Sequence, residues 1–597
     1  MSAEPRQSEP PQSHQGSEPR MSGPRQYDLV IAANRLPVDR VVDADGTSSW
    51  GRSPGGLVTA MDSVMHGRDG AWVGWAGEVG EAPEPFTEGT MYLRPIPLSS
   101  EEIRDYYEGF SNDTLWPIYH DVIVQASFHR EWWRNYERIN RRFAEAIAEV
   151  AAPGATVWVH DYQLQLVPRI VRELRPDVRI GWFDHIPFPP VELFAQLPWR
   201  RAVLEGLLGA DFLGFQRVAD AQNFVRACRQ LLRTPTRKDT VTVTAPDGST
   251  HTARASAIPI SIDFQGLEAL ARTPEVVARA AELRTQLGDP QVLMLGVDRL
   301  DYTKGIRHRL KAYEELLRDK AISPPEVTFV QVATPSRERV NSYRELRSQV
   351  EHTVGRINGE FAPIGSPAVY YQHHSYPRDE MAALFLAADI MLVTPLRDGM
   401  NLVAKEYVTC RPDLGGALVL SEFAGAYHEL HQAFVCNPHD IEGLKQTILR
   451  AIHTPARDKA RIMLALRRRV ADHDVNRWAQ RFLDALAAAP HRPERQERQD
   501  RLDHESRVER HEGEDRKERQ ERQDRMLRPG VEAREEAEVR REAEARQEAE
   551  ALREAEARQK AEALREADVS REVQAPQKAR PGQDVPDRNG QSADARR

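Results

Sequence analysis

Two basic side chains, Arg299 and Lys304, share the segment DRLDYTKGI, which directly follows the apolar run Val292–Val297. Such a run is typical of a buried strand, so both cations are expected just beyond a strand end. Together they suit a diphosphate leaving group, because they can neutralise the negative charge that develops as it departs. The competing interpretation is a pair of surface cations engaged in ordinary ion pairs.

A second pattern typical of phosphate binding follows the apolar run Ile390–Thr394, in PLRDGMNLVAKEYV. Asp398 and Gly399 predict a turn, and a helix is expected to begin near Asn401. The free amides and the dipole at a helix N-terminus favour a bound phosphate. Glu406 lies about one turn inside this helix, where its carboxylate is placed to accept hydrogen bonds from ribose hydroxyls.

Polar side chains follow three further apolar runs. Arg337 stands in TPSRERV, Asp161 in VWVHDYQL and His185 in GWFDHIPFPP, each just after a predicted strand. A carboxylate and an imidazole at adjacent strand ends can hold sugar hydroxyls or move protons. Each side chain taken singly is equally well a satisfied structural group, so the prediction depends on their occurring together.

Glycines and aromatic residues of the first half carry weaker signals. Arg35 follows a predicted strand in ANRLP, and the pair Gly55-Gly56 lets backbone amides approach a ligand closely. Aromatic faces stack on sugar rings and a tyrosine hydroxyl reaches a phosphate. Two clusters, WVGWAGE and YYEGFSNDTLWP, supply the candidates Trp72, Trp75, Tyr107 and Trp116. The alternatives are a plain turn for the glycines and core packing for the aromatic rings.

The segment Asp43-Ala44-Asp45-Gly46-Thr47 matches the short nucleophile motif of aspartate-dependent phosphatases. Such a nucleophile requires a buried strand before it, whereas only Val41-Val42 precedes this motif. Asp-Gly is a strong turn signal, so a hairpin turn is the prediction.

These candidates are positioned by short apolar runs that alternate with amphipathic stretches such as Arg134–Val150 and Asp379–Ala388. The predicted strands are Leu29–Ala33, Thr156–Val159, Ile180–Phe183, Val292–Val297, Val327–Val332 and Ile390–Thr394. This alternation predicts an α/β fold of parallel sheets covered by helices on both faces. Two sheets fit the length, with a join near Pro259–Asp263. Ligands are then expected beyond the carboxyl ends of the strands.

Composition limits the class of protein. The 597 residues suffice for several domains, and the net charge of −9 argues against a nucleic-acid partner. Three cysteines without a close pair argue against disulfides and a cysteine-only zinc site, which fits a reducing cytoplasm. No apolar run approaches the ~20 residues of a membrane helix. We therefore expect a cytoplasmic protein with no membrane partner.

After Phe482 the chain has no aromatic residue and becomes rich in Arg, Glu, Gln and Ala. A twelve-residue repeat, REAEARQEAEAL and then REAEARQKAEAL, runs from Arg541 to Leu564. These residues are strong helix formers, but the apolar positions are mostly alanine, which does not favour a stable coiled coil. The prediction is a solvated charged helix or a disordered tail; a partner-binding or self-association helix is the alternative.

Ten motifs occur in order between Tyr27 and Ala489: ANRLP, PGGL, WVGWAGE, LWPIYH, WVHDYQL, HIPFPP, LLGADFLGFQ, GVDRLDYTKGI, VTPLRDGMNLVAKEYV and LSEFAGA. Together they closely resemble the trehalose-6-phosphate synthases, retaining glycosyltransferases with two Rossmann-like domains facing each other across a cleft (GT-B). The resemblance implies an acceptor domain at 27–260 and a nucleotide-sugar domain at 261–489. The composition of the two ends predicts a disordered leader at 1–26, which is polar and rich in Pro, Ser and Gln, and a charged tail at 490–597.

The resemblance implies a role for each matching residue. Glucose 6-phosphate would be held by Arg35, Tyr107, Asp161 and Arg337, in a pocket shaped by Trp116 and by one or both of Trp72 and Trp75. The nucleotide sugar would be held by Gly55, Gly56, Arg299, Lys304, Leu402, Val403, Ala404, Lys405 and Glu406. Asp398 and His185 would lie over the transferred glucose. Tyr376 stands where the family usually has Phe near the base.

The implied reaction moves glucose from a nucleotide-glucose, UDP-glucose being the expected donor, to glucose 6-phosphate and yields trehalose 6-phosphate. Retention without an obvious carboxylate nucleophile favours attack from the front face, assisted by Arg299 and Lys304. No cofactor or metal is implied, and association of identical chains stays open. Alternatives are another GT-B synthase, such as a glycogen or sucrose-phosphate synthase, and a catalytically silent sugar-phosphate sensor.

Overall fold

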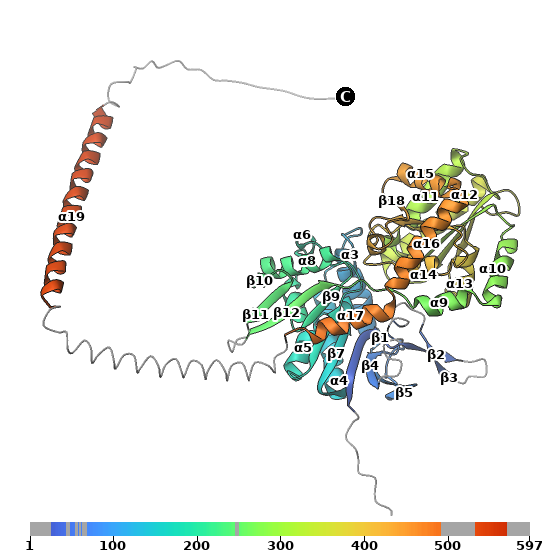
Figure 1. Ribbon diagram of the computed structural model, residues 1–597, viewed down its shortest axis with the longest axis horizontal. Helices are drawn as coiled ribbons and strands as arrows, with labels where there is room; N and C mark the ends of the chain where they lie inside the picture. Colours follow the sequence, from blue (N-terminus) through green and yellow to red (C-terminus); the bar gives the residue numbers. More distant parts are fainter. Residues whose placement is uncertain are drawn as a thin grey trace, which may run out of the picture. The chain divides into compact units, whose positions relative to one another are not determined.

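The computed structural model describes residues 26–42, 48–53, 58, 61, 69–244, 250–490 and 532–569. They belong to two compact units, Met1–Arg495 and Gln496–Arg597. The first unit contains two large sheets with their helices, and the second contains one long helix (Figure 1). Each unit is described by itself below.

The first sheet has ten strands in the order β10-β11-β12-β9-β8-β7-β1-β4-β6-β5. Its seven central strands, β12 to β6 in that order, pair in parallel, and the edge strands β5, β10 and β11 pair antiparallel. The strands are β1 (Tyr27–Arg35), β4 (Gly70–Trp75), β5 (Phe86–Glu88), β6 (Met91–Ile96), β7 (Ala151–His160), β8 (Arg179–Phe183), β9 (Phe212–Phe215), β10 (Thr236–Arg237), β11 (Thr240–Thr244) and β12 (Thr250–Ala257). The three strands expected in this half, in β1, β7 and β8, are confirmed.

Helices connect these parallel strands, as the alternation of apolar runs predicts. They are α2 (Ser100–Glu102), η1 (Ile103–Leu115), α3 (Trp116–Tyr119), α4 (Arg130–Val150), η2 (Tyr162–Leu164), α5 (Val167–Leu174), α6 (Val191–Phe194), α7 (Arg200–Leu207), α8 (Val218–Ala227) and η3 (Cys228–Leu232). Helix α4 buries one apolar face, with Tyr136, Ile139, Phe143 and Ile147 packed against the sheet core. The expected helix Arg134–Val150 is therefore confirmed, with one further turn at its start.

The second sheet has six parallel strands in the order β15-β14-β13-β16-β17-β18. They are β13 (Val292–Arg299), β14 (Val327–Thr334), β15 (Val369–Gln372), β16 (Ile390–Val393), β17 (Ala417–Ser421) and β18 (Phe434–Cys436). One face packs against α11 (Ile306–Arg318), α12 (Asn341–Phe361) and α15 (Ile441–His453). The other packs against α9 (Phe264–Ala271), α10 (Pro274–Gln286), α13 (Arg378–Ala387), α14 (Leu402–Thr409) and α16 (Ala456–Asp472). This arrangement confirms the predicted α/β class with two parallel-sheet domains.

The last helix of the first unit, α17 (Val475–Ala487), lies against the first sheet although it follows α16 of the second in sequence (Figure 1). Phe482 stacks on Trp158 at a centroid distance of 4.2 Å. Gly181 and Gly214 make this approach possible, because an added Cβ would lie 2.7 and 2.9 Å from the ring of Phe482. The chain thus returns from the second sheet to the first, where α17 packs against β8 and β9.

A short hairpin, β2 (Val38–Val42) and β3 (Ser48–Arg52), follows β1 and pairs Val42 with Ser48. The predicted turn at Asp43–Thr47 lies outside the described residues. Its two flanking strands are antiparallel partners, as a hairpin requires.

The second unit contributes helix α19 (Glu532–Val569). Every side chain described between residues 538 and 559 is exposed. Its charged residues surround the helix on all sides, since the twelve-residue repeat does not return its alanines and leucines to one face. Across the described part of the chain, no helix joins the length and the apolar character that crossing a bilayer requires.

Removing every residue after Pro490 is expected to leave the melting temperature within about 2 °C of that of the full chain. The rate of the expected glucose transfer should stay within about twofold. The reason is that α17 and the carbonyls of Ala487 and Ala489, which accept from Arg179 at 2.8 and 3.3 Å, are retained. Calorimetric melting and initial rates are the measurements. As a control, a chain ending at Asp474 lacks α17, exposes Trp158, and should not fold stably. A shortened chain to Pro490 that melts more than about 10 °C lower would contradict the prediction.

Candidate active site

The loops that carry the candidate residues of the two sheets meet at one place. Gly399, after β16, lies against the backbone of His185 and Ile186, after β8, so closely that an added Cβ would be 2.7 Å from the carbonyl oxygen of His185. The guanidinium carbon of Arg337, after β14, lies 3.8 Å from the ring centre of Trp116. Residues from both sheets therefore line a common cleft at the carboxyl ends of the strands.

Lys304 lies deep in this cleft, at the end of the short helix η4 (Tyr302–Lys304). Its Nζ donates to Oδ2 of Asp398 at 2.6 Å, and Asn401 Nδ2 donates to the same oxygen at 3.2 Å. Burial alone would raise the pKa of Asp398, but Lys304 holds it below its usual value. Gly305 follows with φ +64°, and any side chain there would collide with the carbonyl of Thr394. The lysine is thus fixed between the ends of β13 and β16.

Arg299, the other predicted cation, ends β13 and is exposed. Its guanidinium carbon lies 5.3 Å from the ring centre of Trp116, on which Arg337 also packs. Arg299 and Lys304 both lie close enough to the buried Asp301 carboxylate to lower its pKa, so the two cations share one neighbourhood.

Arg337 has a left-handed backbone, with φ +51°, and a guanidinium that is almost fully buried. It donates to Asp301 at 3.0 Å, to the Tyr343 hydroxyl, and across the cleft to the Tyr162 hydroxyl at 3.1 Å. Its Nε has no hydrogen-bond partner in the described part of the chain. The carboxylate paired with Arg337 is thus Asp301, and not one of the glutamates close to it in sequence such as Glu338 or Glu345.

Arg35 stands on the other side of the cleft, at the end of β1. It pairs with Asp39 and covers the ring of Trp75 at 5.0 Å, while its Nε is buried without a partner among the described residues. Tyr107 lies 6.3 Å from Trp75, ring to ring. Although burial opposes the charged form, neighbouring tyrosine and aspartate side chains, Tyr107 among them, hold the pKa of Arg337 above its usual value. Tyr107 therefore lies near both the ring beneath Arg35 and the guanidinium of Arg337.

Trp72 and Trp75 point to opposite faces of β4. The side chain of Trp72 is only 1% exposed, belongs to the core, and donates from Nε1 to the backbone carbonyl of Arg35 at 3.0 Å. Trp75 supports Arg35 directly. Of the two rings that the sequence suggested, only Trp75 is therefore placed to shape a pocket, and Trp72 supports the loop from beneath.

Asp161 and His185 follow adjacent strands and contact each other. The backbone N–H of His185 lies 3.4 Å from Oδ1 of Asp161, and Asp161 itself has φ +74°. Burial raises the pKa of Asp161 to about 6, although Arg299 and Arg337 favour its ionised form. Burial lowers the pKa of His185 to about 3, so its imidazole is neutral near pH 7. The pair offers a carboxylate acceptor and a neutral imidazole to a ligand.

Helix α14 begins where the sequence predicts. Asn401 is its N-cap, with φ +81°, and its side chain accepts from the amide of Ala404 at 3.1 Å. The preceding amides, of Leu402 and Val403, have no acceptor among the described residues. Burial raises the pKa of Glu406, whose carboxylate makes no hydrogen bond or ion pair within the described chain. The start of α14 thus offers two amides and one carboxylate.

Lys405 belongs to the segment Leu402–Glu406 that we expect to hold the nucleotide sugar, but its side chain is 1% exposed and turned into the protein. Its Nζ contacts Glu429 at 2.5 Å and the carbonyl oxygen of Ile260 at 2.9 Å. Lys405 is therefore a structural cation. Ala404 contributes no free amide either, because its N–H is bonded to Asn401.

Tyr376 and the pair Gly55-Gly56 are also expected to contact the nucleotide sugar. Tyr376 is half-buried and lies against His374 at a ring distance of 4.3 Å, before α13. Gly55 and Gly56 lie outside the described residues. No group of three or more His, Cys, Asp or Glu side chains within the described ranges is arranged to hold a metal ion.

Four cleft residues were missed by sequence reasoning: Asp301, Tyr343, Tyr162 and His120. The first three hold the guanidinium of Arg337. His120 is 1% exposed and stacks on Trp116 at 4.0 Å, and burial lowers its pKa to about 3. All four lie within or beside the quoted motifs, so proximity to a motif was the available signal.

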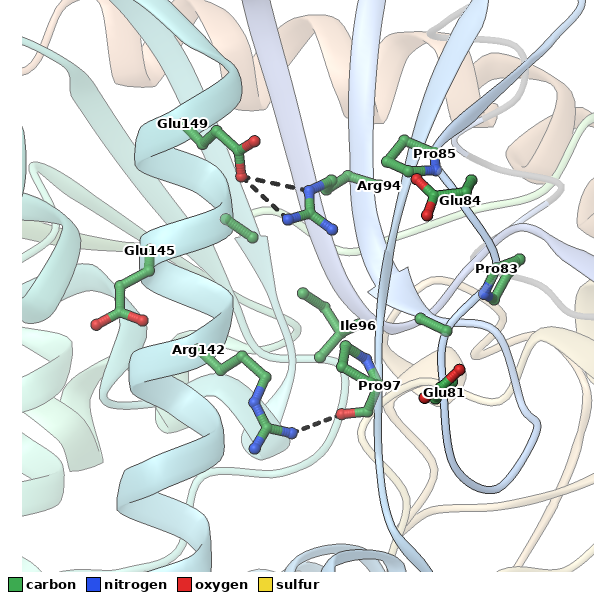
Figure 2. Close-up of a pocket in the computed structure, with 12 residues that line it drawn as sticks. Glu81, Pro83, Glu84, Pro85, Arg94, Ile96, Pro97, Arg142, Glu145 and Glu149 are labelled. Carbon is green, nitrogen blue, oxygen red and sulfur yellow. Dashed lines mark hydrogen bonds and ion pairs between the residues drawn. The ribbon is translucent and has the colours of Figure 1, made fainter. Parts of the chain in front are cut away.

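A separate hollow of about 620 Å³ lies between α4 and the segment from Glu81 to Pro97 (Figure 2). Arg94 donates to Glu149 at 3.1 Å, and Arg142 donates to the carbonyl oxygen of Pro97 at 2.5 Å. Both arginines that line this hollow are therefore engaged, and it offers no unpaired cation to a phosphate.

Comparison with known proteins gives a consistent result. The model of glycosyltransferase family 20 matches residues 27–488. A trehalose-6-phosphate synthase of Mycobacterium sp. (strain KMS) is 56% identical over 464 residues, covering 77% of this chain and 95% of the relative. A UDP-forming α,α-trehalose-phosphate synthase of Burkholderia xenovorans, solved with glucose 6-phosphate, superposes with a TM-score of 0.70 at 33% identity, over 77% of this chain and 100% of its own. A structure from E. coli with bound UDP-2-fluoro glucose superposes with a TM-score of 0.71 at 32% identity, over 78% of this chain and 100% of its own.

Proposed function

The chain belongs to glycosyltransferase family 20, and we propose that its cleft transfers glucose from UDP-glucose to glucose 6-phosphate, giving trehalose 6-phosphate and UDP. One observation carries the assignment of the acceptor. Arg35 of the first sheet and Arg337 of the second each keep a buried Nε–H without an acceptor in the described chain. Buried donors are rarely left unpaired, and a phosphate supplies the missing acceptors.

Glucose 6-phosphate binds between the two sheets in this proposal. Arg35 and Arg337 hold its phosphate, and the Tyr107 hydroxyl lies between them. Asp161 accepts from the hydroxyls of the sugar ring, while Trp75 and Trp116 form the walls. Since the phosphate contacts both domains, acceptor binding favours the closed cleft.

UDP-glucose binds at the ends of β13 and β16. Arg299, Lys304 and the amides of Leu402 and Val403 hold the diphosphate, and Glu406 accepts from the ribose. Gly55, Gly56 and Tyr376 complete the donor site in this proposal, the tyrosine near the base. Asp398 and His185 lie over the transferred glucose, consistent with the close approach of Gly399 to His185.

The reaction retains the anomeric configuration by attack from the face that the leaving group vacates. The acceptor hydroxyl forms the new bond to the anomeric carbon as the bond to the diphosphate oxygen breaks. The departing diphosphate takes the hydroxyl proton, and Arg299 and Lys304 stabilise its charge. Positioning and electrostatics thus supply the catalysis.

An assay of the full chain with UDP-, GDP- and ADP-glucose and glucose 6-phosphate tests the function. We expect trehalose 6-phosphate, with UDP-glucose giving the highest kcat/KM. Glucose without the phosphate is the control acceptor and should react far more slowly. Calorimetric binding of glucose 6-phosphate with no product from any donor would identify a sugar-phosphate sensor instead.

Asp161→Asn is expected to weaken glucose 6-phosphate binding about tenfold and yet to stabilise the protein at neutral pH by roughly 1–3 kcal/mol. Burial raises the pKa of Asp161 to about 6, so between about pH 4 and 6 the folded chain keeps a proton that the unfolded chain has lost. The wild type therefore loses stability as the pH rises from about 4 to 6, and the variant should not show this pH-dependent loss. Denaturant unfolding at pH 4 and 7.5, with calorimetry of acceptor binding, measures both effects. Equal destabilisation of the variant at both pH values would contradict the assignment.

A further inference from the structure

A second histidine, His160, packs against His185. It is the last residue of β7 and is completely buried. Its Nδ1 lies 3.1 Å from Nε2 of His185, and the two rings stack with centres 5.3 Å apart. Sequence reasoning gave no role to His160, and it does not border the proposed ligand positions.

The surroundings of this pair are aromatic. Trp158 lies 4.9 Å from the ring of His160, and Phe183 lies 4.7 Å from the ring of His185. Trp478 of α17 lies 6.3 Å from His185 and closes the same wall. Burial lowers the pKa of both histidines, so both rings are neutral near pH 7. Between two neutral imidazoles, one nitrogen must donate its proton and the other must accept.

The remaining nitrogen of His160 decides the direction of this hydrogen bond. Its Nε2 is buried and has no partner within the described residues. If His185 were the donor, His160 would carry its proton on Nε2, as a buried N–H without an acceptor. If His160 is the donor, Nε2 is only an unused lone pair. Orphaned buried N–H groups are the rarer of the two, so donation from His160 Nδ1 is favoured.

We infer that His160 is a positioning residue that donates to Nε2 of His185 and thereby fixes the proton of His185 on Nδ1. His185 then presents Nδ1–H as a hydrogen-bond donor to a hydroxyl of the transferred sugar. The inference rests on the proposed function, because it assumes that His185 contacts the donor sugar. To the proposed function it adds the tautomer and the orientation of His185, and it names His160 as the residue that sets both.

Two substitutions of His160 separate positioning from packing. His160→Leu fills the apolar site but removes the donor, whereas His160→Asn keeps an N–H on the atom equivalent to Nδ1. Because the surroundings are aromatic, the His160→Leu variant is expected to have a higher melting temperature than His160→Asn. The activities should follow the opposite order: kcat/KM for UDP-glucose falls at least about tenfold in His160→Leu and recovers to within about threefold in His160→Asn. If activity follows stability instead, His160 is a packing residue and the inference is wrong.

His185→Ala distinguishes this inference from the proposed function. A His185→Ala variant with normal kcat/KM would remove the role of His185 itself. If that variant is impaired but His160→Leu is not, the sugar contact stands and the positioning role fails. The double variant His160→Leu/His185→Ala should be no worse than His185→Ala alone, since both changes remove one interaction.

Nitrogen NMR of the full chain, labelled with 15N-histidine and loaded with UDP, gives a direct readout of the tautomer. We expect the His185 signals, assigned by comparison with His185→Ala, to show the proton on Nδ1. In His160→Leu the two tautomers should become mixed. A wild-type signal with the proton on Nε2 would overturn the inference.

Discussion

Lys304→Ala lowers kcat by about 100- to 1,000-fold and leaves the KM for glucose 6-phosphate within about threefold. Removing one preorganised donor from a developing negative charge typically costs about 2.7–4 kcal/mol of transition-state stabilisation. Lys304 is buried at the junction of two strand ends, within 2.6 Å of Asp398, so a water molecule cannot reproduce its charge or position. Steady-state kinetics with each substrate varied in turn is the measurement.

The buried partner of Lys304 requires a control for this result. Alone, Lys304→Ala leaves Asp398 with Asn401 as its described side-chain donor, and an uncompensated buried carboxylate could itself disturb the cleft. Lys304→Ala combined with Asp398→Asn removes that charge as well. If the loss of kcat arises from the leaving group, the double variant is at least as slow as the single one, since Asp398 is itself placed over the transferred glucose. Recovery of kcat in the double variant would locate the defect in Asp398 instead.

Lys405, a second buried lysine, lies in α14 and offers a comparison with Lys304. Lys405→Met removes a buried ammonium that is bonded to Glu429 and to the carbonyl oxygen of Ile260, on a side chain turned into the protein. Its effect should appear in the melting temperature, with kcat changed by less than about threefold in the protein that remains folded. The two lysines thus separate turnover from stability.

The positions of the cleft residues could be predicted because parallel sheets impose them. Once apolar runs are recognised as strands, the polar residues after each run must gather at one edge, whatever the loops look like. Arg299, Lys304, Asp161 and His185 were found in this way. The same rule does not say which residues of one loop face inward.

Periodicity alone explains two details of side-chain orientation. Adjacent helical residues point about 100° apart, so the side chains of Lys405 and Glu406 point in different directions. In a strand, residues three apart lie on opposite faces, so Trp72 and Trp75 lie on opposite faces of the sheet. Both orientations follow from the sequence once the elements have been assigned.

Other features depend on contacts between residues far apart in sequence. Asp301 is 36 positions from Arg337, whereas Glu338 and Glu345 are close in sequence, and Arg337 reaches Asp301 from a left-handed backbone. The return of α17 to the first sheet likewise depends on Gly181 and Gly214, whose missing side chains accept Phe482. No local pattern encodes either pairing.

Arg337→Ala is expected to have two separable effects. It should weaken glucose 6-phosphate binding about ten- to a hundredfold, because a bidentate contact to phosphate is lost. It should also destabilise the protein by roughly 3–5 kcal/mol, because Asp301 is completely buried and loses its main partner. Although burial alone would raise it, Arg337, Arg299 and Lys304 hold the pKa of Asp301 below its usual value. The wild type therefore loses this stabilisation as the pH falls below about 4.

Arg337→Lys separates the two effects, because lysine keeps a positive charge beside Asp301 but lacks the planar fork that matches two phosphate oxygens. We expect this variant to recover most of the lost stability and still to bind glucose 6-phosphate at least about tenfold more weakly than the wild type. Its affinity for UDP should be unchanged, since the donor contacts lie at Arg299, Lys304 and α14. Calorimetric titration with each ligand, and thermal melting of the same samples, measure these quantities. If Arg337→Lys is stable and binds the acceptor normally, Arg337 serves only to neutralise Asp301, and the phosphate must be held by Arg35 alone.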